Sequence, residues 1–528
     1  MRIVCLLLIS CAVAAQNLRS GGVLKPVQAL MDIKHYTIAL DVDPEKKTIK
    51  GYTEIDLTLS ESAPLLLLDF WHGLKVDAIW VDGKAETYEH GEDDLVRIRR
   101  LGSFEKGKHK VRVAYGGTPG VAERPPWTGG FQWSHDSQGN PWIAVTCQSE
   151  GGKIFFPCKD HPSDEPDEGA DMIITVPAGL TVAGPGILKE KTNNENQSTF
   201  HWSTSYPISN YCLVFNIGKY VKVSRNYKTI AGNQVPMDFY VLEEHHDKAA
   251  HHLDVLARTA GVLEKYFGEY PWVQEKIGIA ETPHLGMEHQ TMNAYGNHFK
   301  YTKVGGEDFD WLLTHEFGHE WWANKVTNKD WAHMWIQEGI CSFGDALYVR
   351  ELAGEEAYLA RMRNTARATQ NAKPIVQGEA IDSDQAYHGD IYGKGAFFMH
   401  TLRYVLGDST FFPILKRLAT APEYTYNHFV TTDDVEKLFS TASGRELKPL
   451  FDFYLRTTEK LEVSVLQKSD TTFVVKFNNF NGTLPIDIQT DAGIVRTEIG
   501  PSGTTLQSNA GWIRVDPVGY YLKRVIME

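Results

Sequence analysis

The sequence WLLTHEFGHEWW, residues 311–322, contains the pattern His-Glu-x-x-His. On an α-helix, residues four apart lie on one face, so His315 and His319 can direct two imidazoles at a single cation. Glu316 lies one position further round, close to that cation but off the ligand direction, where it can hold a water. The segment therefore predicts a metal centre on a helix, with an acid or base beside it.

A third ligand is needed, because His-Glu-x-x-His alone is only suggestive. Glu338 supplies a carboxylate after a gap long enough for a loop and the start of a second helix near Trp335. Two neutral imidazoles and one carboxylate leave the fourth position of a tetrahedral zinc open to water, which is the catalytic arrangement. Zinc lowers the pKa of that water, and Glu316 can take its proton during attack on a carbonyl.

Hydrophobic periodicity divides the chain around this segment into three parts, as expected for 528 residues. Period-two alternation begins at Tyr36 and recurs in short strands to about residue 230. Apolar residues then recur at helical steps, and alternation returns from Leu461. We predict a multidomain α+β protein with an N-terminal antiparallel β domain (residues 24–230), a mainly helical catalytic domain (231–456) and a small C-terminal β domain (457–528).

Composition excludes several classes of protein. Hydrophobic residues at 42% and charged residues at 23% are typical of a globular protein, not of a disordered, collagen-like or polytopic membrane chain. The net charge of −14 is not offset by any Lys/Arg-rich block. A sequence-independent nucleic-acid binder needs a cationic surface, so we expect no nucleic-acid partner.

Residues 1–15 have the features of a signal peptide. An apolar run from Ile3 to Ile9 is followed by small residues up to Ala15, and the run is shorter than the roughly 20 residues that a spanning helix needs. We therefore expect an exported protein, periplasmic or extracellular, without a transmembrane span. The stretch LISC, residues 8–11, also fits a lipoprotein cleavage site, so a membrane-tethered lipoprotein acylated at Cys11 is the alternative.

Four cysteines follow the signal peptide, and none forms a C-x-x-C pair, so a thiolate zinc site is unsupported. Cys147 and Cys158 are the only close pair, and an oxidising compartment would permit a disulfide between them. We expect free buried thiols, because a core of this size does not need cross-links.

The motifs resemble those of the zinc aminopeptidases related to aminopeptidase N and to the leukotriene-hydrolysing aminopeptidases, which are gluzincin metallopeptidases. The family's Trp-x-x-Asn-x-Val-Thr stretch is matched by Trp321–Thr327, and its Trp-x-x-Glu-Gly segment by Trp335–Gly339. Its substrate-anchoring motif, Gly-x-Met-Glu-Asn, corresponds to LGMEH at 285–289, which departs at the first and last positions. The resemblance covers about residues 30 to 455 and implies a thermolysin-like catalytic domain.

The resemblance also assigns substrate-binding residues. It implies that Glu288 and Gln148 hold the substrate amine and that Gly286 and Met287 belong to the strand that binds substrate. A carboxylate near the zinc has an independent rationale, because an exopeptidase must recognise a free ammonium about one residue's length from the metal.

Two further roles rest on the resemblance. Tyr392 lies in a Tyr-x-Lys-Gly segment whose tyrosine stabilises the oxyanion, and without the resemblance nothing would separate it from Tyr387. Asp345, two helical turns beyond Glu338, matches a carboxylate that can orient a zinc ligand.

The sequence therefore predicts a metallo-aminopeptidase with one zinc ion per chain. Zinc-activated water would attack the N-terminal peptide bond of peptides with a free N-terminus. The alternatives are an endopeptidase on the same zinc scaffold and a catalytically silent zinc-bound binding module. If anionic groups crowd the site around Glu288, peptides with neutral or basic N-terminal residues should be favoured over acidic ones.

Overall fold

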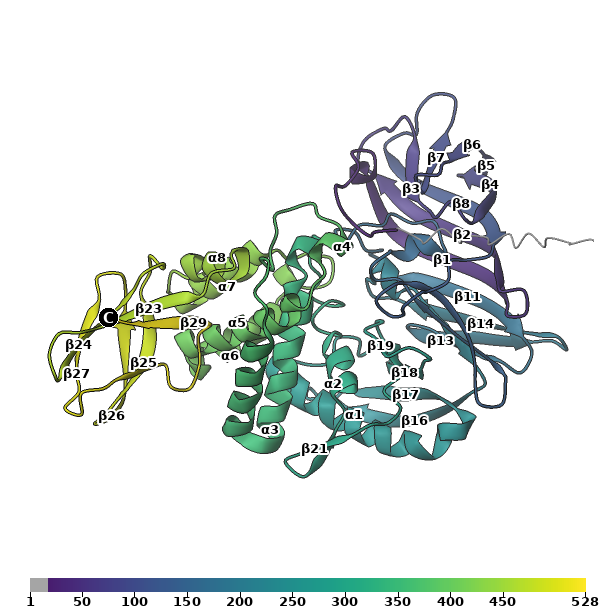
Figure 1. Cartoon of the computed structure of the whole chain (residues 1–528). Helices are drawn as coiled ribbons and strands as arrows, with labels where there is room; N and C mark the ends of the chain where they lie inside the picture. Colours follow the sequence, from purple (N-terminus) through teal and green to yellow (C-terminus); the bar gives the residue numbers. More distant parts are fainter. Residues whose placement is uncertain (1–17) are drawn as a thin grey trace, which may run out of the picture.

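The computed structural model describes residues 18–528, and the predicted signal peptide with Cys11 lies outside the described residues. Figure 1 shows three parts in a row, with a β-rich unit at each end and the helices between them. This arrangement confirms the predicted fold class. No helix within residues 18–528 is long and apolar enough to cross a membrane.

The N-terminal domain is built on a large twisted sheet with the strand order β13-β14-β11-β1-β2-β8-β4-β5. Its strands are β1 (Met31–Asp43), β2 (Thr48–Leu59), β4 (Lys75–Val81), β5 (Lys84–Ala85), β8 (Gly107–Gly117), β11 (Ala170–Pro177), β13 (Ile187–Asn193) and β14 (Gln197–Thr204). Strands β1 and β2 form an antiparallel hairpin, in which buried residues alternate with residues that are mostly partly buried, as the period-two pattern from Tyr36 predicts. The sheet is antiparallel except where β1 pairs with β11 in parallel.

Smaller sheets complete this domain. One has the order β12-β15-β10-β9 and another the order β3-β7-β6. Their strands are β3 (Leu66–Asp69), β6 (Thr87–His90), β7 (Leu95–Arg99), β9 (Gly130–His135), β10 (Pro141–Thr146), β12 (Thr181–Ala183) and β15 (Asn216–Gly218). Strand β10 matters for the site, because it delivers the segment that contains Gln148 to the catalytic domain.

The catalytic domain begins with a sheet of order β16-β17-β18-β20-β19. Its strands are β16 (Tyr220–Lys228), β17 (Gln234–Leu242), β18 (Ile277–Glu281), β19 (Gly286–Met287) and β20 (Asn293–Tyr295). Strand β16 pairs along its length with β17, so this sheet starts before the domain boundary that we predicted at residue 230. A hairpin of β21 (Thr302–Val304) and β22 (Glu307–Phe309) follows.

Helices form the rest of this domain. They are α1 (His246–Phe267), α2 (Trp311–Gly318), α3 (Trp335–Ala368), α4 (Ser383–Ala386), α5 (Asp390–Leu406), α6 (Asp408–Thr420), α7 (Thr432–Ser443) and α8 (Lys448–Arg456). Helix α2 begins at a defined point, because the Asp310 side chain accepts hydrogen bonds from the main-chain N–H groups of Leu312 and Leu313. The Asp310 carboxylate is itself held by the Tyr295 hydroxyl at 2.6 Å.

The C-terminal domain consists of two small packed sheets, with the orders β27-β24-β23-β29 and β26-β25-β28. Their strands are β23 (Leu461–Gln467), β24 (Thr472–Phe477), β25 (Leu484–Thr490), β26 (Gly493–Ile499), β27 (Thr504–Gln507), β28 (Arg514–Val515) and β29 (Lys523–Met527). It joins the catalytic domain through stacked Tyr404 and Tyr520 rings, whose centroids are 3.9 Å apart.

Cysteines in the described residues are all free and buried, including Cys147 and Cys158. The expectation of buried thiols without a disulfide therefore agrees with the structure.

Candidate active site

Helices α2 and α3 bring the predicted metal ligands together. His315 lies on α2, His319 directly follows its last turn, and Glu338 lies in the first turn of α3. The two Nε2 atoms are 3.2 Å apart. Glu338 Oε2 lies 3.4 Å from His315 Nε2 and 3.3 Å from His319 Nε2. The ligand atoms of two neighbouring histidines and of a glutamate on the next helix thus form a nearly equilateral triangle.

This triangle fits a tetrahedral zinc ion. A regular tetrahedron with edges of about 3.3 Å has its centre about 2.0 Å from each corner, in the range of zinc bonds to nitrogen and oxygen. Glu338 Oε2 is buried and lacks a hydrogen-bond partner among the described residues, as expected of an atom reserved for a metal. The donor set of two imidazoles and one carboxylate leaves the fourth corner for a water or substrate.

The other nitrogen of each imidazole is held by a fixed acceptor. His315 Nδ1 lies 3.1 Å from Asp345 Oδ2, and His319 Nδ1 lies 2.7 Å from the main-chain oxygen of Trp322. Both contacts favour the tautomer with the proton on Nδ1, which leaves Nε2 free for a metal. Asp345 thus lies beside a proposed zinc ligand, as the family resemblance implied.

Glu316 lies close to the ligand triangle. Its carboxylate oxygen, one from Glu288 and a nitrogen of His319 all lie within 4.8 Å of one another. Burial raises the pKa of the Glu316 carboxyl, and the neighbouring Glu288 carboxylate adds to that rise. A carboxyl group with a raised pKa suits proton transfer near neutral pH.

Gly286 leaves room for Glu316. A Cβ at this position would lie 2.7 Å from Glu316 Oε1 and 2.8 Å from Leu312 Cδ1, closer than van der Waals contact allows. Glycine on β19 therefore lets the carboxylate lie against the strand.

Replacing Gly286 by Ala should therefore displace the Glu316 carboxylate. We expect kcat to fall about tenfold, since a small misplacement of a reacting group lowers the reaction rate strongly. Thermal stability should change little. The matched control is Gly261→Ala on α1, where an added Cβ would meet only the Tyr227 hydroxyl, at 3.7 Å. Equal kcat values for Gly286→Ala and the wild type would contradict this interpretation.

Glu288 is held by residues from both domains. Gln148 donates a hydrogen bond to Glu288 Oε1 from the N-terminal domain, and the Tyr211 hydroxyl donates to the same oxygen at 3.1 Å. The main-chain oxygen of Glu288 accepts from the Asn324 side chain at 2.9 Å. Tyr211 was missed by sequence reasoning, and no local pattern around it could have revealed a contact that only the meeting of two domains creates.

Tyr392 lies in the first turn of α5, beside the ligand triangle. Its hydroxyl oxygen is 3.0 Å from Glu338 Oε1 and 3.2 Å from the Tyr387 hydroxyl oxygen. Burial raises the pKa of Tyr392 well above its ordinary value, so the hydroxyl keeps its proton. The structure thus brings both tyrosines to the site, although the sequence assigned a role to Tyr392 alone.

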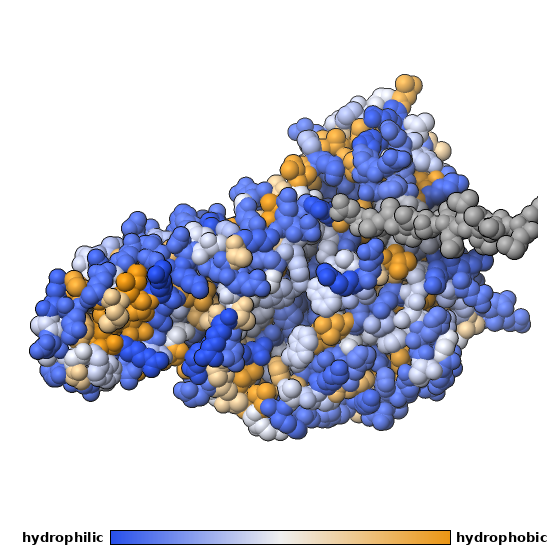
Figure 2. Space-filling model, in the orientation of Figure 1, coloured by the Kyte–Doolittle hydropathy of each residue, from blue (hydrophilic) through white to orange (hydrophobic). Residues whose placement is uncertain are grey.

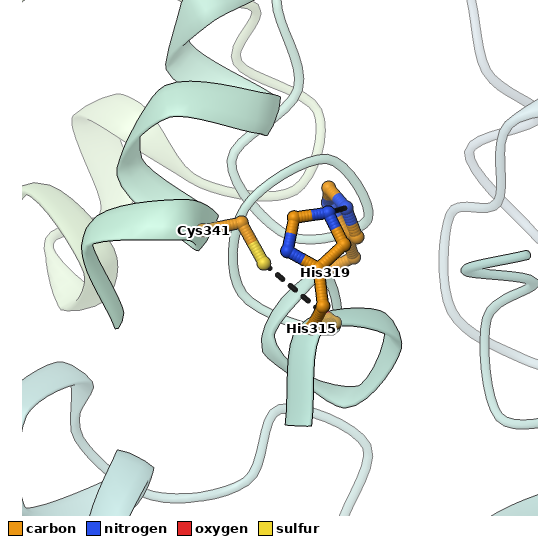
Figure 3. Close-up of side chains that lie close together, drawn as sticks. All are labelled: His315, His319 and Cys341. Atoms are coloured by element: carbon orange, nitrogen blue, oxygen red, sulfur yellow. Dashed lines mark hydrogen bonds between the residues drawn. The ribbon is translucent and has the colours of Figure 1, made fainter. Parts of the chain in front are cut away.

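Cys341 is another residue that the sequence did not place at the site. Its thiol lies 3.0 Å from the main-chain oxygen of His315 and donates a hydrogen bond to it (Figure 3). A Cβ at Gly318 would lie 2.7 Å from the Cys341 sulfur, so this glycine permits the close contact between α2 and α3. Its spacing of three residues from Glu338 was the available signal.

A cavity of about 300 Å³ connects these groups and opens between the N-terminal and catalytic domains (Figure 2). Its walls include Gln148, Met287 and the indoles of Trp127 and Trp311. Four carboxylates line it, and no Lys or Arg does so within residues 18–528. These carboxylates belong to Glu288, Glu316, Glu338 and Asp345.

Comparison with known proteins gives matches along both of the first two domains. Residues 33–212 match the peptidase M1 N-terminal domain and residues 251–454 match the peptidase family M1 domain. Leucine aminopeptidase 2 of Candida glabrata is 26% identical over 71% of this chain and 58% of its own length. Leukotriene A-4 hydrolase of Xenopus laevis is 23% identical over 72% of this chain and 64% of its own. The chain thus spans about three fifths of the length of these curated relatives.

A solved structure shares the fold. The M1 zinc metallopeptidase of Deinococcus radiodurans superposes with a TM-score of 0.70 at 22% identity, covering 84% of this chain and 95% of that one. The family matches span the N-terminal domain and the helices that carry the ligand triangle. The chain belongs to peptidase family M1.

Proposed function

We propose that the chain is a zinc-dependent aminopeptidase, which binds one zinc ion and removes the N-terminal residue from peptides with a free N-terminus. One observation carries this proposal: a Glu288 oxygen lies within 4.8 Å of a His319 nitrogen. A substrate ammonium held by Glu288 would leave room for only one residue between the amine and the metal centre. The names of the relatives, which include leucine aminopeptidase 2, support the same activity.

His315, His319 and Glu338 would hold the zinc ion. A zinc ion held there would supply a Lewis acid, which polarises a carbonyl and lowers the pKa of a bound water. Glu316 would take a proton from the attacking water and then give it to the departing nitrogen. The Tyr392 hydroxyl, on the Glu338 side of the site, donates a hydrogen bond to the developing oxyanion.

Glu288 and Gln148 hold the substrate amine in this proposal. Burial raises the pKa of the Glu288 carboxyl, and the charge of a bound ammonium lowers it again, so the pair forms in its ionised state. Gly286 and Met287 on β19 line the cavity beside it, where an extended peptide can lie along the strand.

Zinc dependence is tested by removing the metal. We expect a chelator to abolish hydrolysis of an aminoacyl fluorogenic substrate, and one equivalent of zinc per chain to restore it. Full activity in protein whose zinc content is shown to be zero would contradict the proposal.

The carboxylates of the cavity predict a preference for the charge of the N-terminal residue. We expect kcat/KM to be about tenfold or more higher for arginyl and leucyl substrates than for glutamyl or aspartyl substrates, because four carboxylates line the cavity and no Lys or Arg among the described residues of its wall is there to pair with an acidic side chain. A panel of aminoacyl fluorogenic substrates measures this, with a salt series to confirm that charge is responsible. Equal kcat/KM values for leucyl and glutamyl substrates would contradict it.

We also propose that the protein is exported, on the basis of the signal-peptide features of residues 1–15. Mass spectrometry of the mature protein from its source cells distinguishes the two forms. A chain that begins at Gln16 indicates a soluble exported protein, an acylated Cys11 indicates a membrane-tethered lipoprotein, and an uncleaved chain in the cytoplasm would contradict export.

A further inference from the structure

Residues 19–22, here called the N-terminal strap, lie between the N-terminal and catalytic domains. Ser20 N donates to Ser149 O at 2.8 Å, and Ser383 N donates to Ser20 O at 3.0 Å. Gly21 forms an antiparallel bridge with Asp382 just before α4, which in Figure 1 lies where the two domains meet. One short segment is therefore bonded through its main chain to both domains.

The strap lies against a buried ion pair of the N-terminal domain, formed by Lys153 and Asp160. The buried Ser20 hydroxyl donates to Asp160 Oδ1 at 2.9 Å. Asp160 pairs with Lys153 at 2.9 Å, with both side chains at most 10% exposed, and Lys153 also donates to Arg19 O. A buried ion pair is tolerated only when its remaining hydrogen-bonding capacity is met. The strap supplies two of those hydrogen-bond partners, the Ser20 hydroxyl and the main-chain oxygen of Arg19. The hydrogen bonds of the ion pair are therefore complete only when the strap is in place.

Gly21 fixes the path of the strap. Its φ is +78°, in the left-handed region that favours glycine, and a Cβ would lie 2.4 Å from Trp331 Cδ1. Trp331 is buried in the catalytic domain. The strap therefore packs so closely against the catalytic domain that any side chain at position 21 would have to displace the strap or Trp331.

The residues that the strap contacts in the two domains, Ser149 and Ser383, are each connected to residues of the active site. Ser149 follows Gln148, whose amide holds Glu288. Ser383 begins α4, and its main-chain oxygen accepts a hydrogen bond from Tyr387 N at 3.0 Å. The Tyr387 hydroxyl oxygen in turn lies 3.2 Å from that of Tyr392. The strap thus connects two sides of the cavity that come from different domains. Gln148, on the amine-binding side, belongs to the N-terminal domain, and the two tyrosines on the other side belong to the catalytic domain.

We propose that the N-terminal strap positions Tyr387 and Tyr392 against the Gln148 edge of the cavity, and that Ser20 and Gly21 are positioning residues for the reaction. This inference rests on the proposed aminopeptidase function. The strap touches neither the ligand triangle nor Glu316 in the contacts described above. We therefore assign its effect on kcat to Tyr392, and any effect through Gln148 and Glu288 to KM.

Gly21→Val tests the proposal, with Gly83→Val as its matched control. Gly83 has a φ of +77° but no atom within 4 Å of an added Cβ, so it carries the same backbone strain without a collision. At a temperature where all variants are fully folded and bind one zinc, we expect Gly21→Val to lower kcat about tenfold or more. Gly83→Val should keep the wild-type kcat. Ser20→Ala, which removes only the bond to Asp160, should lower kcat about threefold and serves if Gly21→Val does not fold.

Repeating Gly21→Val in a Tyr392→Phe background separates positioning from general damage. If the strap acts through Tyr392, kcat should fall less than about threefold in that background, because interacting residues have non-additive effects. An equal fall in both backgrounds, or a wild-type kcat in Gly21→Val, would overturn the proposal.

Amide hydrogen exchange gives a readout that does not depend on activity. We expect faster exchange at residues 383–392 in Gly21→Val and unchanged exchange there in Gly83→Val. Unchanged exchange in both variants would overturn the strap's role. Absence of aminopeptidase activity in the wild type would instead contradict the proposed function, and the exchange rates would still decide whether the strap orders this segment.

Discussion

Glu316→Gln should lower kcat about 1000-fold while the protein still binds one zinc ion. The amide has nearly the shape of the carboxylate but cannot accept a proton from water. The ligand triangle of His315, His319 and Glu338 does not involve the Glu316 side chain, so metal binding should persist. Steady-state kinetics on an aminoacyl fluorogenic substrate and elemental analysis of zinc measure the two effects.

Glu356→Gln is the matched control, because Glu356 is exposed on α3. It should leave both kcat and zinc content unchanged. Wild-type turnover in Glu316→Gln would remove Glu316 from the mechanism, whereas loss of zinc from that variant would show that its effect is structural.

Glu288→Ala should lower kcat/KM about 100-fold, mainly through a higher KM, because the substrate ammonium loses a charge-assisted hydrogen bond. The substitution also leaves Gln148 and the Tyr211 hydroxyl without the acceptor that they share. Kinetics on a leucyl substrate, with zinc content as a check on folding of the site, measure this loss.

Glu288→Gln separates charge from hydrogen bonding, because the amide can still accept a hydrogen bond but carries no charge. We expect an intermediate loss in kcat/KM, about tenfold. If Glu288→Ala and Glu288→Gln both bind and cleave the leucyl substrate as the wild type does, another group must recognise the amine.

Local spacing was sufficient to predict that two of the proposed metal ligands meet. His315 and His319 meet because helical geometry places residues four apart on one face, and no tertiary information is needed for that contact. Glu338 could be proposed from its distance along the chain, but its convergence with the histidines to within 3.4 Å depends on how α2 packs against α3. The three-part division of the chain likewise followed from periodicity.

Features created by long-range contacts were missed. Strand β18 is buried along its whole length, so it lacks the alternation that reveals a strand, and the sheet of the catalytic domain went unrecognised. Tyr211 reaches Glu288 from another domain, and the strap reaches α4 from more than 300 residues away in sequence. Such contacts are set by domain packing, which no local pattern records.

The same peptide with a free and with an acetylated N-terminus provides the most direct test of the proposed aminopeptidase function. We expect the zinc-bound protein to release the N-terminal residue of the free peptide and to leave the acetylated peptide intact, because acetylation removes the charge that Glu288 recognises. Absence of cleavage in both peptides would favour a catalytically silent zinc-bound module. Equal cleavage of both peptides would contradict the role of Glu288 and favour an endopeptidase on the same zinc scaffold.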